Sequence, residues 1–278
     1  MKRARPFTQV DVFSREPLRG NPLAVVHDSK GLNETQMAAL ARWTNLSETT
    51  FLLPPTDPGA DYYVRIFTPA AELPFAGHPT LGTCHAWLAA GGKPRKAGIV
   101  MQQCGVGLVR VRCDGPRLEF AAPPLRRTGP LERELISRIA KGLRVAESEI
   151  VQHQWVDNGP GWSAVMLRSA KQVLSLKPDW AALSSLKLGV VGPHEAGHDA
   201  AFEVRAFIGD GGYEDPVTGS LNASLAQWMI GAGLAQPAYV AAQGAALKRA
   251  GRVYLRKDGD DVWVGGDVVE VVRGEISL

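Results

Sequence analysis

Two spacings of apolar residues recur along this chain of 278 residues. In residues 7–14 and 48–55, apolar and polar positions alternate, which is typical of half-buried β-strands. In residues 131–145, leucine and isoleucine recur every three or four positions, which predicts an amphipathic helix. Residues 33–43 have a similar spacing behind Asn33, a residue that can cap a helix. The sequence therefore predicts a globular protein that mixes helices and strands.

The stretch "ELPFAGHPTLGTCHAWLAAGG", residues 72–92, follows a predicted strand at 62–69. Gly77 permits an unusual backbone conformation or a close approach by a ligand. Pro79 suits the first turn of a helix, where its missing N–H is not needed. The small and apolar residues that follow predict a buried helix over 79–90, and the N–H groups at its start form a site that attracts anions.

A second loop and helix of this kind follow a predicted strand near residue 202. Trp228 lies 141 positions after Trp87, and Gly233 lies 141 positions after Gly92. Such matches at about half the chain length favour duplication of one module, although chance similarity between two small-residue helices would also produce them. With duplication, the starts of the two helices are expected to face one cleft.

The remaining segments are mostly predicted strands. Residues 97–124 and 251–278 contain short apolar runs that end at glycine or proline, as strands joined by tight turns do. Residues 151–169 predict a strand, a turn and a second strand, and residues 179–192 a short helix followed by a strand.

Composition and charge exclude several classes of protein. The net charge is +3, and the basic residues are scattered, so we expect no nucleic-acid partner. No apolar run approaches membrane-spanning length, and the three cysteines have no metal-ligand spacing, which favours a reducing cytoplasmic location. In "HEAGH", residues 194–198, two histidines flank a glutamate as in a zinc helix, but the nearby glycines and proline predict a loop, and we expect no metal.

Three polar residues are candidates for catalysis. Glu48 is the charged residue in an otherwise uncharged junction between a predicted helix and a predicted strand. Desolvation there would raise the pKa of its carboxyl group, or Glu48 only closes a turn. His78 could move a proton or hold a carboxylate, or be an ordinary loop residue. Asp215 could lie in the cleft beside N–H groups of Gly219 and Ser220 that grip a carboxylate, or be a helix N-cap.

Five stretches together resemble the PhzF family, named for phenazine biosynthesis. They occur in family order: "DVFSREPLRGNPLAVV", "NLSETTF", "RIFTPAAELPFAGHPTLGTCHAW", "VDNGPGW" and "YEDPVTGSLNASLAQWM". The resemblance implies the α+β fold of diaminopimelate epimerase, in which two pseudo-symmetric halves each wrap a partial β-barrel around a central helix. We expect residues 1–120, closed by the C-terminal strand, to form one half and residues 121–278 the other.

The resemblance also implies roles for single residues. Glu48 matches the family's acid/base, which moves a proton in the isomerisation of dihydro-3-hydroxyanthranilate, and His78 and Asp215 match its other catalytic groups. Gly77 and Ser220 match positions that contact the ligand, and Gly219 lies beside the second of these. The related racemases carry a cysteine at each helix start, which this chain lacks.

We therefore expect a cytoplasmic, homodimeric isomerase that acts on a small carboxylated substrate without metal or cofactor. Two alternatives stay open. The chain could be an epimerase or racemase of an amino or cyclic acid, or a binding protein that kept the cleft and lost activity.

Overall fold

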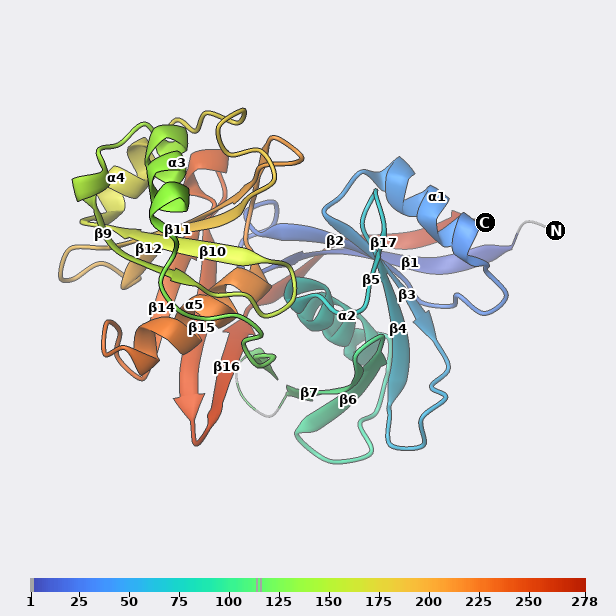
Figure 1. Cartoon of the computed structure of the whole chain (residues 1–278). Helices are drawn as coiled ribbons and strands as arrows, with labels where there is room; N and C mark the ends of the chain where they lie inside the picture. The colour runs from blue at the N-terminus through green and yellow to red at the C-terminus, as the bar shows by residue number, and fades with distance from the viewer. Residues whose placement is uncertain (1–2, 114, 116) are drawn as a thin grey trace. The chain divides into compact units, whose positions relative to one another are not determined.

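The computed structural model describes residues 3–113, 115 and 117–278, which form two compact units. The first unit comprises residues 1–121 together with 265–278, and the second comprises residues 122–264. The last strand of the chain thus belongs to the same unit as the first strand, with which it pairs. Figure 1 shows the chain coloured from its N-terminus to its C-terminus.

The strands of the first unit lie in the order β17–β1–β2–β3–β4–β6–β7–β8. Two neighbouring pairs, β2 with β3 and β4 with β6, are parallel, and the other pairs are antiparallel. The short β5 pairs with β4. The bounds are β1 (Ala4–Val12), β2 (Asn21–Val26), β3 (Glu48–Leu53), β4 (Tyr62–Phe67), β5 (Glu72–Leu73), β6 (Ile99–Cys104), β7 (Gly107–Arg112), β8 (Leu118–Ala121) and β17 (Val268–Ser277).

Each parallel pair in this unit is joined through a helix. The helix α1 (Glu34–Thr44) connects β2 to β3 and begins with a capping box, in which Asn33 and Gln36 bond each other's backbone N–H groups. The helix α2 (Gly77–Ala89) precedes β6 and contacts β1, β2, β3, β6, β7, β8 and β17, so the strands surround it. Close approach of α2 requires a glycine at position 82, because a Cβ there would lie 2.6 Å from Leu23 Cδ2.

The second unit repeats this order of strands. Its strands lie in the order β9–β10–β11–β12–β14–β15, and the pairs β10 with β11 and β12 with β14 are parallel. The short β13 pairs with β12. The bounds are β9 (Ile150–Trp155), β10 (Trp162–Leu167), β11 (Lys187–Pro193), β12 (Phe202–Ile208), β13 (Tyr213–Asp215), β14 (Ala238–Gln243), β15 (Gly251–Asp258) and β16 (Asp261–Gly266).

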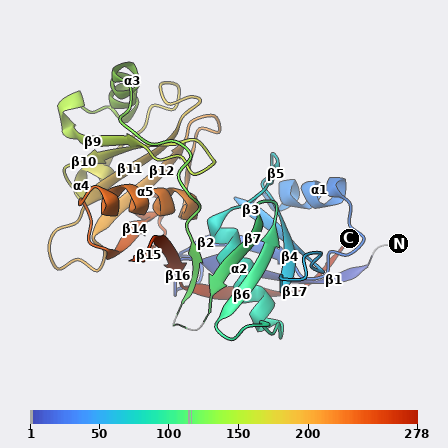
Figure 2. The ribbon, with the colours of Figure 1, turned by 60° about the horizontal axis from the view of Figure 1, so that its bottom comes forward.

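Helices again connect the parallel pairs. The helix α4 (Ala170–Ser175) joins β10 to β11, and α5 (Gly219–Gly231) precedes β14. Figure 2 shows α5 running across the strands of this unit. Leu221 of α5 packs against Gly189 of β11, where a Cβ would lie 2.5 Å from the leucine side chain. The remaining helices are α3 (Arg133–Leu143) and the 3₁₀ turns η1 (Glu147–Glu149) and η2 (Ala245–Leu247).

The structure confirms the pseudo-symmetry and corrects its register. Both bounds of α5 lie 142 positions after those of α2, and the glycine with positive φ that follows each helix is Gly91 or Gly233. The offset of 141 between the tryptophans is therefore not the structural register. Gly92, which the tryptophan register pairs with Gly233, has no positive φ.

One prediction of local structure was wrong. Residues 180–185 form turns instead of the predicted helix. The helix α4 occupies residues 170–175, which lie between two predicted segments. The helix predicted over 79–90 begins two residues earlier, at Gly77. The loop predicted at 194–198 is confirmed. Among the described residues, no helix combines the length and the apolar character that crossing a membrane requires.

Candidate active site

The start of α2 carries two of the predicted residues and lies beside a third. Gly77 and His78 are the first residues of the helix and are buried, and Ala76 is its N-cap without a side-chain cap bond. Glu48 is the first residue of β3. We call residues 74–78 the first entrance.

The side chains of Glu48 and His78 are in contact. Their nearest atoms, Glu48 Oε2 and His78 Nδ1, are 3.3 Å apart, and the two side chains are only 14% and 5% exposed. The amide of Asn21, the first residue of β2, lies 3.5 Å from the same ring nitrogen. A carboxyl group at this distance from an imidazole can exchange a proton with it. The Glu48 carboxyl group and the His78 imidazole are therefore within reach of each other inside one unit.

Burial determines the charge state of His78. The loss of hydration lowers the pKa of His78 to about 3, although a hydrogen bond with the backbone of Pro22 favours the charged form. The imidazole is therefore neutral near neutral pH. A neutral imidazole has one ring nitrogen that donates and one that accepts, so it can pass a proton without first carrying a charge.

The second entrance, residues 216–220, leads into α5. Asp215 is the last residue of β13, and its Oδ2 accepts a hydrogen bond of 2.5 Å from Thr218 Oγ1. Thr218 is the N-cap of the helix, so the alternative that Asp215 is the N-cap is wrong. The Gln243 Oε1 atom accepts from the Thr218 N–H and from Asn222 Nδ2, which fixes the entrance to β14.

Ser220, in the second helical position, contacts the first residue of β10 and the loop before it. Trp162 Nε1 donates to Ser220 Oγ at 3.1 Å, and Asn158 Nδ2 donates to the Ser220 carbonyl at 2.9 Å. Since Oγ accepts from the indole, the hydroxyl hydrogen of Ser220 can be donated to a ligand. The first N–H groups of α5, which include those of Gly219 and Ser220, have no acceptor inside the helix. Together these donors can hold a carboxylate.

The structure thus groups the six predicted residues by unit. The first unit brings together Glu48, Gly77 and His78, and the second unit brings together Asp215, Gly219 and Ser220. Sequence reasoning assigned no role to Asn21, Asn158, Trp162 or Gln243. The first three lie in stretches that resemble the family, Asn21 in "RGNP" and the other two in "VDNGPGW", so the resemblance could have marked them. No motif in the sequence marked Gln243.

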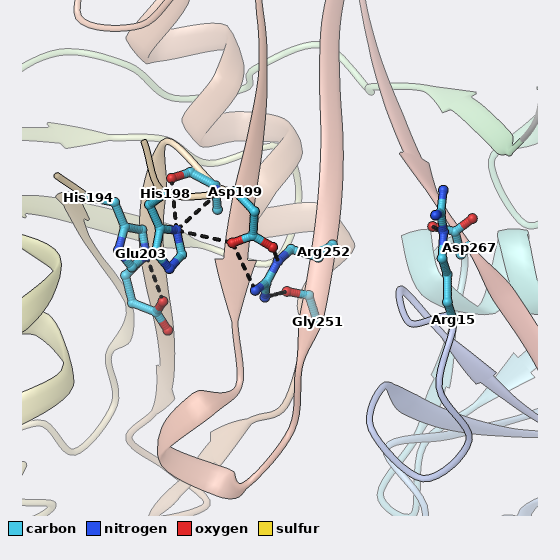
Figure 3. A network of polar contacts seen from close by, with 9 residues as sticks. Arg15, His194, His198, Asp199, Glu203, Gly251, Arg252 and Asp267 are labelled. Carbon is cyan, nitrogen blue, oxygen red and sulfur yellow. Dashed lines mark hydrogen bonds and ion pairs between the residues drawn. The ribbon is translucent and has the colours of Figure 1, made fainter. Parts of the chain in front are cut away.

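The histidines of "HEAGH" form a separate polar network in the second unit. The rings of His194 and His198 stack with their centroids 3.6 Å apart. His194 Nε2 lies 3.1 Å from Glu203 Oε2 (Figure 3). Burial raises the pKa of Glu203 to about 7. Within residues 3–113, 115 and 117–278, no three His, Cys, Asp or Glu side chains are grouped to hold a metal ion.

Comparison with known proteins finds a matching family model and similar sequences. A family model described as "Phenazine biosynthesis-like protein" (PhzC-PhzF) matches residues 10–274. Antisense-enhancing sequence 1 of Schizosaccharomyces pombe is 39% identical over 214 residues, which cover 72% of this chain and 72% of that protein. The trans-2,3-dihydro-3-hydroxyanthranilate isomerase of Pseudomonas chlororaphis is 34% identical over 281 residues, covering 97% and 98%.

Solved structures agree on the fold. The PhzF family phenazine biosynthesis protein of Enterococcus faecalis matches with a TM-score of 0.82 at 25% identity and covers 99% of this chain and 100% of its own. A hydroxyproline epimerase of Agrobacterium vitis matches with a TM-score of 0.58 at 14% identity, covering 100% and 94%. The second likeness concerns the fold alone, which is the predicted α+β, epimerase-like fold.

Proposed function

Because the chain belongs to the PhzC-PhzF family of phenazine biosynthesis-like proteins, we propose that its isomerase activity consists of moving a proton between two carbon atoms of a small carboxylated substrate. The proposed substrate resembles dihydro-3-hydroxyanthranilate, as the name of the Pseudomonas chlororaphis relative suggests. No metal or cofactor takes part in the proposed reaction. The observation that carries the proposal is the buried contact between Glu48 and His78.

In the proposed mechanism, the Glu48 carboxylate removes a proton from a carbon atom next to an unsaturated or carbonyl group. The electron pair of the broken C–H bond moves into the neighbouring π system. Glu48 then returns the proton at another carbon atom, so the product is an isomer and no electrons are gained or lost. The neutral His78 imidazole orients Glu48 or relays the proton, and Asp215 assists at the second entrance.

The substrate carboxylate is assigned to the second entrance. The Ser220 hydroxyl oxygen already accepts a hydrogen bond from Trp162, which leaves its hydrogen for a ligand. The first N–H groups of α5 lie at the same N-terminal end of the helix as Ser220. A carboxylate held there would be fixed in its orientation, and a fixed orientation is what makes intramolecular reactions fast.

The test is the variant Glu48→Gln, which keeps the size of the side chain and removes the base. Loss of a positioned acid/base group lowers kcat by about 10²–10⁴-fold. We expect this loss with little change in substrate affinity, measured by calorimetry. Glu16→Gln is the matched control, because Glu16 is an exposed carboxylate of the same unit. Full activity of a folded Glu48→Gln protein would remove Glu48 from the mechanism.

A second variant tests the carboxylate site. Ser220→Ala should raise KM, or abolish the thermal stabilisation that a bound acid provides, and leave Glu48 chemistry intact. Ser224→Ala is the control, since Ser224 lies one turn further along α5 and bonds the Leu221 carbonyl. Equal behaviour of both variants would place the carboxylate elsewhere.

Turnover in D₂O separates the remaining alternatives. An isomerase places deuterium on the carbon atom that gains the proton, whereas an epimerase labels the existing stereocentre. The second outcome is the alternative function, for which Asp215 supplies a second carboxylate at the other entrance. A ligand that binds and is recovered both unlabelled and chemically unchanged after long incubation would identify a binding protein without activity.

A further inference from the structure

The same short motif precedes both central helices. Glu-x-Pro-x-x-Gly occupies residues 72–77 before α2 and residues 214–219 before α5, again 142 positions apart. In each copy, the glycine is the first helical residue and the glutamate lies in the short strand that leads to the entrance. The glutamates are therefore structurally equivalent.

Each of these glutamates is held by an arginine of the preceding long strand. Arg65 of β4 donates from Nε to Glu72 Oε1 at 2.7 Å and from Nη2 to Oε2 at 2.5 Å. Arg205 of β12 donates from Nε to Glu214 Oε1 at 3.0 Å and from Nη2 to Oε2 at 2.7 Å. Both contacts are two-pronged, a geometry that fixes the carboxylate plane as well as its distance.

The second pair is the more buried one. The side chains of Arg205 and Glu214 are 6% and 5% exposed, against 19% and 34% for Arg65 and Glu72. Arg205 also donates from Nη1 to two backbone carbonyls at the end of α4, those of Val173 and Leu176. This guanidinium therefore connects β12, β13 and α4, and its loss would leave a buried carboxylate without its partner.

We propose that Arg205 and Arg65 are positioning residues, which set the two entrances through the strands β13 and β5. The inference rests on the proposed function. Asp215 follows Glu214 directly and pairs in register with Ala206, the neighbour of Arg205. Displacement of Glu214 would thus move Asp215 and the N–H groups of the second entrance. Displacement of Glu72 would likewise move Gly77 and His78 at the first.

The two arginines should affect different kinetic constants. Lysine keeps the charge but cannot make the two-pronged contact. Arg205→Lys should raise KM by about 10- to 100-fold with kcat nearly unchanged, because the second entrance holds the carboxylate in both ground and transition state. Arg65→Lys should lower kcat by a similar factor with KM nearly unchanged, because the first entrance holds the proton-transfer pair.

Arg252→Lys is the matched control. Arg252 of β15 also makes a two-pronged contact, to Asp199 at 2.8 Å and 3.2 Å, but Asp199 lies in the loop after β11 and leads to neither entrance (Figure 3). This variant should change neither constant. A purely structural role for Arg205 and Arg65 predicts lower thermal stability in Arg205→Lys and Arg65→Lys and no split between KM and kcat.

Amide hydrogen exchange gives a readout that needs no substrate. In Arg205→Lys and in Glu214→Gln, the amides of residues 213–215, 217 and 218 should exchange at least about 10-fold faster, while those of β9 keep their rates. Unchanged exchange, or unchanged constants in an active Arg205→Lys enzyme, would overturn the inference. A wild-type protein that converts no substrate would instead overturn the proposed function, and exchange alone would then decide the positioning role.

Discussion

The buried His78 side chain should make the stability of the protein depend on pH. The His78 side chain is 5% exposed, and burial lowers its pKa to about 3 in the folded protein, whereas an imidazole in an unfolded chain has a pKa near 6.5. Between these two values, the unfolded chain binds a proton that the folded protein does not. The free energy of unfolding therefore falls as the pH falls from about 6.5 toward about 3.

The magnitude follows from linkage. Each pH unit inside this window lowers the free energy of unfolding by about 1.4 kcal/mol for one group. From pH 6.5 to pH 4.5, His78 should therefore remove about 3 kcal/mol, out of a total stability of about 5–15 kcal/mol for an ordinary domain. The substitution His78→Gln removes the titrating group and should remove this loss.

Urea unfolding at pH 7 and pH 4.5 measures the effect. Both proteins are compared in the Glu48→Gln background, so that the neighbouring carboxyl group cannot titrate. Between the two pH values, the His78→Gln protein should lose about 3 kcal/mol less than the protein with His78. Equal losses would refute the neutral, buried imidazole, as would an NMR titration of the His78 ring with a midpoint above pH 6.

Two further predictions concern packing and buried charge. Because burial raises the pKa of Glu203 to about 7, above its unfolded value of 4.5, its carboxyl group lowers stability as the pH rises through that window. Glu203→Gln should gain up to about 3 kcal/mol relative to wild type at pH 8 and nothing below pH 4.5, in urea unfolding at both pH values. Gly82→Ala should lose about 1–3 kcal/mol, because its methyl group would lie 2.6 Å from Leu23 and 2.9 Å from Val12. Gly231→Ala, which meets no described atom within 4 Å, should show no such loss in the same thermal unfolding scan, and equal losses would contradict the packing argument.

The sequence by itself determined the elements whose signals are local. The Asn33 cap, the amphipathic spacing of α3 and the Gly-His-Pro start of α2 depend on neighbouring residues, and the structure has each of them. The family stretches supplied the fold and the candidate residues, of which Glu48 and Asp215 lie at strand ends and the other four at the two helix starts. Homodimer formation and the cytoplasmic location stay predictions.

Tertiary structure alone decided the contacts between distant positions. Glu48 and His78 are 30 residues apart, and their contact depends on how β3 packs beside the start of α2. The register of the repeat follows from the glycine that adopts positive φ after each helix. In the first copy the sequence "AGG" offers both Gly91 and Gly92, and only the structure shows that Gly91 adopts this conformation. Arg205 and Glu214 look like ordinary surface residues in the sequence, and only the folding of β13 onto β12 buries them as a pair. Local propensity acts over a few residues, whereas burial and charge pairing depend on which strands become neighbours.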